Sequence, residues 1–129
     1  MLMRIDFPKP DKSRQKAWIN HTLESISVLY PNVGIYDCED HPHVLSKDES
    51  EAFAIAEMFG GKVKWGVNFT GKSDSAGDFY QLRAKLHTFL EQQSNPNLEY
   101  VISRLHGNNL ILYVNDKSMA MLTKLSFVR

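Results

Sequence analysis

The sequence contains one cysteine, Cys38, among its 129 residues, so an internal disulfide is impossible. A chain of this length buries a core without disulfides or structural metals. We therefore expect one domain over residues 1–129. Because disulfides are rare in reducing compartments, a single cysteine also fits a cytoplasmic protein.

Long apolar runs are also missing. No stretch approaches the roughly 20 apolar residues that a membrane-spanning helix needs. The N-terminal segment carries charges and prolines where a secretory signal needs an apolar run. We expect a soluble cytoplasmic protein that has no membrane partner.

The sequence has no excess charge of either sign, because 15 basic residues balance 15 acidic ones. A neutral protein has no long-range field that attracts nucleic acid, although a local basic patch remains compatible with this balance. The chain also lacks the serine-hydrolase, Walker A, dinucleotide-binding and zinc-protease motifs. These absences leave enzymatic activity uncertain and favour a non-enzymatic protein.

The clearest pattern that is present covers residues 62–70, where every odd-numbered position is apolar. Strand side chains alternate between two faces, so this segment predicts a strand with one apolar face and one polar face. We expect helices to cover the Trp65 face. We expect the face that carries Lys62 and Lys64 to stay open to solvent.

Helical periodicity and turn residues divide the rest of the chain into elements. The predicted fold class is α+β with two layers, in which one mostly antiparallel sheet of about four strands is backed by three to four helices. No internal repeat is evident. The predicted helices cover residues 11–30, 46–59 and 78–93, and the predicted further strands cover residues 1–7, 33–36, 98–105 and 110–114.

Two helical segments carry specific expectations. Ser46 is expected to cap the helix that follows it. In this helix, the apolar face of Ala52 and Ile55 is expected to be widened by Phe53 and Met58. Residues 119–125 fit either a helix or a strand. The helix propensity of methionine, alanine, leucine and lysine favours the helix there, with Ser118 as its cap.

The most polar segment, residues 37–43, is the candidate metal site. Cysteine, histidine and carboxylate are zinc ligands, so Cys38, His41 and His43 predict a possible zinc site and a metal-dependent enzyme. The alternative is an acidic loop with solvated histidines and a small apolar cysteine. A reactive Cys38 is disfavoured, because the neighbouring carboxylates raise the pKa of its thiol.

A second candidate site is the lysine face of the 62–70 strand, which would bind the phosphates of a nucleic acid. Its candidate binding residues are Lys62, Lys64, Asn68 and Arg83. The alternative is that these lysines only keep a half-exposed sheet soluble.

The third hypothesis is a protein-binding surface. Met119 and Met121 are adaptable apolar residues that are common at interfaces, and the C-terminal hairpin is expected to leave an open sheet edge. The leading prediction is a small non-enzymatic protein-interaction module with a regulatory or accessory role. Its expected partner is another protein or a second copy of the chain, as in a homodimer.

Overall fold

The computed structural model of the chain describes residues 1–8, 15–36, 42–69, 75–104 and 107–127. The chain divides into two compact units, an N-terminal unit, Met1–Lys64, and a C-terminal unit, Trp65–Arg129. One strand, β4 (Lys62–Asn68), begins in the first unit and ends in the second. None of the helices in the described residues has both the length and the apolar character needed to cross a membrane.

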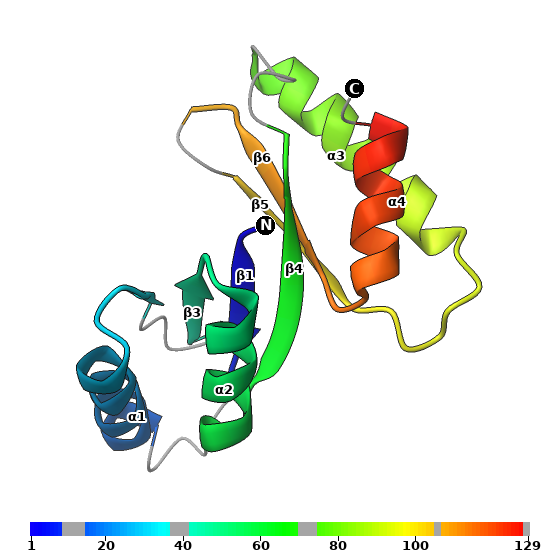
Figure 1. The fold of residues 1–129 in the computed structure, drawn as a ribbon. Helices are drawn as coiled ribbons and strands as arrows, with labels where there is room; N and C mark the ends of the chain where they lie inside the picture. Colours follow the sequence, from blue (N-terminus) through cyan, green and yellow to red (C-terminus); the bar gives the residue numbers. More distant parts are fainter. Residues whose placement is uncertain (9–14, 37–41, 70–74, 105–106, 128–129) are drawn as a thin grey trace. The chain divides into compact units, whose positions relative to one another are not determined.

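Among the described residues of the N-terminal unit there are three complete strands and two helices (Figure 1). In chain order its elements are β1 (Met3–Asp6), α1 (Gln15–Leu29), β2 (Gly34–Tyr36), β3 (His43–Ser46) and α2 (Glu49–Phe59). Strand β3 lies between β1 and β2 and is antiparallel to both.

The core of the N-terminal unit lies on one face of its strands. Ile5 pairs with Val44, which in turn pairs with Ile35, so these side chains share a face. Phe7 meets Trp18 of α1 edge to face, with ring centroids 6.1 Å apart. The buried apolar side chains of this unit are Met3, Ile5, Phe7, Leu23, Ile26, Val44, Ala52, Ile55 and Ala56.

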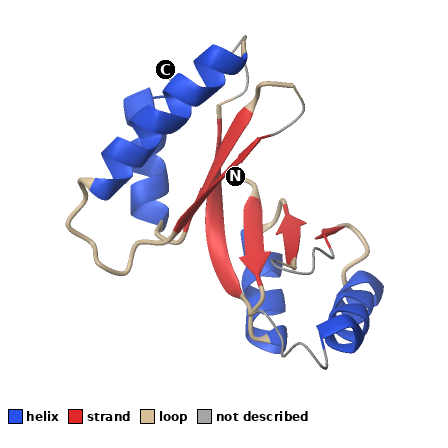
Figure 2. Ribbon diagram, turned by 180° about the vertical axis from the view of Figure 1, so that it is seen from behind, coloured by secondary structure: helices blue, strands red, loops and turns tan. Residues whose placement is uncertain are grey.

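The C-terminal unit contains the end of β4, two further strands and two helices (Figure 2). In chain order these are α3 (Ala76–Glu91), β5 (Tyr100–Arg104), β6 (Leu110–Val114) and α4 (Lys117–Phe127). Strand β6 lies between β4 and β5 and is antiparallel to both.

The apolar face of β4 is covered by helices, as its alternation predicts. Val67 and Phe69 are buried in one cluster with side chains of α3 and α4, and Trp65 packs against this cluster. The buried residues of the cluster are Val67, Phe69, Phe79, Leu86, Leu90, Leu110, Leu112, Val114 and Ala120.

The two units repeat one order of elements, strand-helix-strand-strand-helix. In each unit the third strand lies in the middle, between the first and the second. A hydrogen bond just after the first strand of each unit also recurs. The Phe7 amide donates to the Pro42 carbonyl, and the Phe69 amide donates to the Leu110 carbonyl. The structure therefore corrects the expectation of no repeat. This order is the beginning of the split βαβ motif.

The second helix of each unit starts in the same way. The Asp48 carboxylate accepts a hydrogen bond from the Glu51 amide at 3.1 Å, and the Asp116 carboxylate accepts one from the Met119 amide at 3.0 Å. Both aspartates satisfy an amide that the first helical turn leaves without a backbone acceptor. The expected caps, Ser46 and Ser118, are thus replaced by aspartates. Ser46 instead donates a hydrogen bond to the Glu51 carboxylate at 2.7 Å.

The predicted α+β class is confirmed, and so is the helical state of residues 119–125. The predicted sheet was too small, because the described residues form six strands in the order β2-β3-β1-β4-β6-β5. Strand β3 was missed because it has four residues and directly follows a proline-containing polar segment. The expectation of a single domain stays a prediction.

We predict that Asp116→Ala lowers the free energy of unfolding by about 1 kcal/mol, because the Met119 amide loses its acceptor. The matched control is Ser118→Ala, which removes the residue that the sequence had suggested as the cap. Chemical denaturation of the two variants and the wild type measures the difference. An equal loss in the Ser118→Ala variant would contradict the assigned cap.

Candidate protein-binding surface on helix α4

Helix α4 turns one face into the core of the C-terminal unit. Ala120 and Thr123 are fully buried, and Phe127 packs against the buried cluster. The Thr123 hydroxyl donates a hydrogen bond to the Met119 carbonyl at 2.7 Å, so this buried polar group is satisfied. This face accounts for the stability of the helix within its unit.

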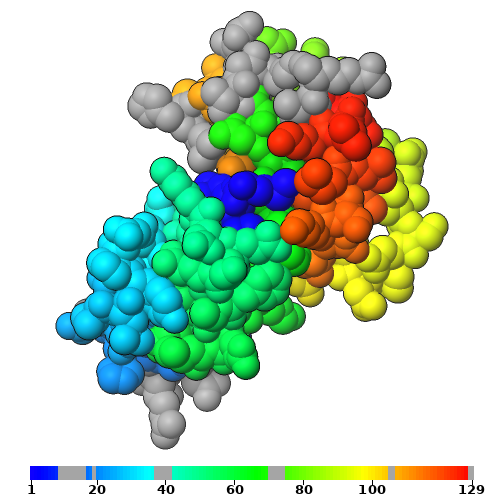
Figure 3. All heavy atoms as spheres, viewed as in Figure 1, coloured from blue at the N-terminus to red at the C-terminus, as the bar shows by residue number. Residues whose placement is uncertain are grey.

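The opposite face of α4 is also apolar, and it is exposed. Met121 and Leu122 are each 44% exposed, and Leu125 is 70% exposed. At 3.6 residues per turn these three positions lie on the side of the helix opposite Ala120 and Thr123. Figure 3 shows α4, in orange to red, at the surface of the protein. A helix that is apolar on both sides is typical of a buried helix, so its outer face suits a partner.

A groove runs between α3 and α4. It has a volume of about 400 Å³ and is lined by Ala84, Phe89 and Phe127, with polar side chains beside them. The rings of Phe89 and Phe127 meet edge to face, with centroids 5.3 Å apart. This packing joins the last residue of α4 to α3.

Helix α2, which corresponds to α4 in the repeated order, also exposes apolar side chains. Phe53 is 45% exposed and Met58 is 59% exposed. The expectation that they widen the buried face of the helix was wrong. Helical geometry explains the difference, because Ala52, Ile55 and Ala56 already fill the inward stripe and the other two positions fall outside it.

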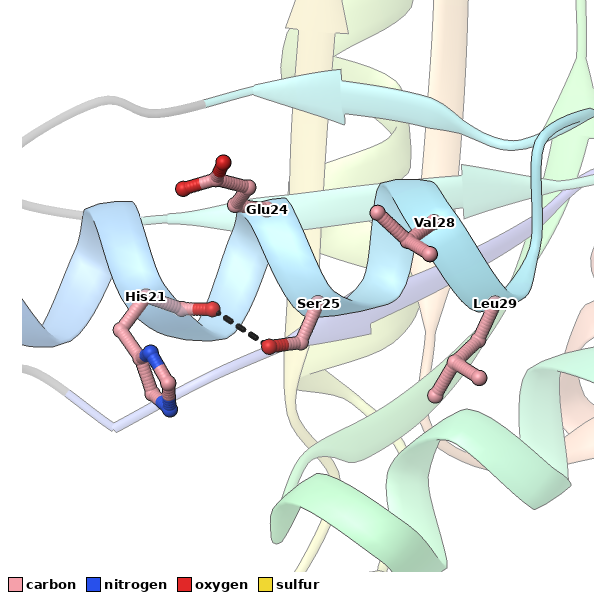
Figure 4. A pocket seen from close by; sticks show the side chains of 5 residues that line it. All are labelled: His21, Glu24, Ser25, Val28 and Leu29. Atoms are coloured by element: carbon pink, nitrogen blue, oxygen red, sulfur yellow. Dashed lines mark hydrogen bonds between the residues drawn. The ribbon is translucent and has the colours of Figure 1, made fainter.

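A pocket on α1, of about 530 Å³, is lined by His21, Glu24, Ser25, Val28 and Leu29 (Figure 4). The Ser25 hydroxyl donates a hydrogen bond to the His21 carbonyl at 2.8 Å, within the helix itself. Glu24 points away from the side of the helix on which His21 lies. These titratable groups therefore do not converge on one point, as an acid–base pair must.

The C-terminal hairpin places β5 at the end of the strand order, where its outer edge faces no further strand among the described residues. The Tyr100 hydroxyl lies 2.8 Å from Nδ1 of His87 on α3, which ties this edge strand to the helix. Burial, and then the negative charge of Glu91, raise the pKa of Tyr100, so this hydroxyl stays protonated at neutral pH.

The candidate nucleic-acid residues do not form the open lysine face that was expected. Lys62, Asn68 and Arg83 are exposed, but Lys64 is only 6% exposed. The Lys64 ammonium donates a hydrogen bond to the Asp6 carboxylate at 2.8 Å, and the Arg4 guanidinium donates another to the same carboxylate at 2.8 Å. A buried charge is stable only when it is paired, and Asp6 supplies the pair.

Two of the three candidate zinc ligands, Cys38 and His41, lie outside the described residues, so the zinc site stays a prediction. His43 belongs to β3, where it is buried and stacks on Tyr36 with ring centroids 4.8 Å apart. Within the described part of the chain, no group of three histidine, cysteine or carboxylate side chains is placed to hold a metal ion.

No family model, no curated protein and no solved structure matches this chain.

The sequence reasoning missed Leu122 and Leu125 as surface residues. Their signal was available, because a helix over residues 119–125 puts them on the side opposite Ala120. Drawing that helix as a wheel would have shown two apolar faces where one suffices for packing.

The environment of Asp6 predicts how the stability of the protein depends on pH. Burial alone would raise the pKa of Asp6, but the hydrogen bonds and charges of Lys64 and Arg4 outweigh burial and hold the pKa below its ordinary value of 3.8. We predict that Asp6→Asn lowers the free energy of unfolding by about 1–3 kcal/mol at neutral pH.

The sign of the pH dependence follows from the lowered pKa. The stabilisation by Asp6 is complete above the pKa of the unfolded state and is lost as the pH falls through the folded-state pKa. The wild type and Asp6→Asn should therefore converge in acid, as measured by urea unfolding across pH. The control variant is Glu24→Gln, which removes the charge of an exposed carboxylate outside the Asp6 cluster. Equal stability of the wild type and Asp6→Asn at neutral pH would show that the cluster contributes nothing.

Proposed function

We propose that the protein is a small non-enzymatic protein-interaction module, regulatory or accessory, and that the outer face of α4 is its binding surface. The observation that carries the proposal is the second apolar face of this helix. Met121, Leu122 and Leu125 lie opposite the residues that pack into the core. Folding of the C-terminal unit leaves this outer face exposed, so its apolar side chains are available to a partner.

The geometry of the face supports this reading. Its three side chains lie one and three residues apart, which is the pattern that a helix presents to a groove or to another helix. The face belongs to a regular helix that is anchored by Ala120 and Thr123, so it is fixed before a partner binds. A preformed surface reduces the entropy lost on binding.

The described residues offer less support for the other two hypotheses. The lysine face retains Lys62 at the surface, while Lys64 is committed to Asp6 in the N-terminal unit. The zinc hypothesis depends on Cys38 and His41. A cytoplasmic location is part of the proposal, on the grounds of the single cysteine.

The test is a comparison of captured proteins. The wild-type protein and the Leu125→Gln variant are immobilised separately and exposed to lysate of the source cell. Bound proteins are then cross-linked to the immobilised protein and identified by mass spectrometry. We expect a specific partner to be retained by the wild type and reduced about tenfold or more with Leu125→Gln, since the burial of one leucine side chain is lost, which is worth about 1.5–3 kcal/mol.

The matched control is Val28→Gln on α1, which changes another exposed apolar residue. The Val28→Gln variant should retain the partner. Both variants should have the same midpoint of denaturant unfolding as the wild type. The proposal is wrong if every captured protein binds Leu125→Gln as well as it binds the wild type.

A further inference from the structure

Helices α2 and α4 hold corresponding places in the repeated order, but they carry opposite charges. The sequence of α2, ESEAFAIAEMF, has three glutamates and no basic residue. The sequence of α4, KSMAMLTKLSF, has two lysines and no acidic residue. Each helix is thus a surface of one sign in a chain whose total charge is zero.

One exposed apolar position is common to the two helices. Counting from the capping residues Asp48 and Asp116, Phe53 and Met121 occupy the same position, and they are 45% and 44% exposed. Each unit therefore exposes a large apolar side chain at the same position of its second helix.

The charged residues lie next to these apolar positions. Glu57 follows Phe53 by four residues and Lys124 follows Met121 by three, so each charge is a neighbour of an apolar side chain on its helix surface. Both charged residues are exposed. Apolar contact and opposite charge are therefore available on the same pair of surfaces.

We infer that the partner of this protein is a second copy of the chain, in which α2 of one copy packs against α4 of the other. The inference rests on the proposed function, because it names the partner of the same α4 surface. Glu57 of one copy lies beside Lys124 of the other in this arrangement. In the apolar centre, Phe53 of one copy packs against Met121 and Leu125 of the other.

Charge selects this pairing over the two symmetric alternatives. Two α4 helices packed together would oppose lysine with lysine, and two α2 helices would oppose glutamate with glutamate. Like charges across an interface cost free energy and opposite charges fix the register. The neutral total charge also leaves no long-range repulsion between copies.

One helix pair is smaller than a standard interface of about 1,600 Å², so we expect weak association with a dissociation constant on the order of micromolar. Sedimentation velocity of the purified full chain, over concentrations from below to well above this range, measures it. The samples are the wild type, Glu57→Lys, Lys124→Glu and the double variant.

Each single reversal should weaken self-association about tenfold, because an attractive pair becomes a repulsive one. The double variant should restore the wild-type affinity, since the pair is then re-formed with its signs exchanged. Glu24→Lys on α1 and Arg83→Glu on α3 are matched controls that reverse exposed charges elsewhere, and they should self-associate as the wild type does.

A wild type that remains monomeric at every concentration overturns the inference. Self-association that the single reversals leave unchanged, or that the double variant fails to restore, overturns the α2–α4 contact. A monomer that still captures a partner dependent on Leu125 would refute the second copy alone and leave the protein-interaction function in place. A monomer that captures none would refute both.

Discussion

The alternation of side chains along β4 is the constraint on which both units depend. Its odd-numbered positions, Trp65 and Val67, fill the core of the C-terminal unit. Its even-numbered Lys64, on the other face, supplies the ion pair that neutralises Asp6 in the N-terminal unit. A shift of this strand by one residue would put lysine into an apolar core and tryptophan beside a carboxylate, so its register is strongly specified.

Local patterns predicted the elements better than they predicted the surface. The alternation in β4 and the helix over residues 119–125 needed only neighbouring residues, and both are confirmed. The burial of Lys64 depends on Asp6, which lies 58 positions away along the chain and has no local signature. The exposure of Phe53 did have a local signature, because Ala52, Ile55 and Ala56 already make up the inward stripe of α2. The zinc ligands and the binding role of the exposed lysines stay predictions.

The repeat was hidden because the two units share architecture more than sequence. When the second helices of the two units are compared position by position, the same residue occurs at the cap, Asp48 and Asp116, and at the last helical position, Phe59 and Phe127. The other identical residues are small ones between these two positions. The cap and the inward-facing small residues are what the fold requires at these places. The outer positions differ in charge, so α2 is acidic and α4 is basic.

The ion pair between Asp6 and Lys64 also orders events during synthesis. It joins the first strand of the N-terminal unit to the last residue of that unit, so its loop closes late and at an entropic cost. Until Lys64 has left the ribosome, the Asp6 carboxylate has no lysine to hold it and stays hydrated. The N-terminal unit therefore lacks this ion pair until the first three residues of β4 have been made.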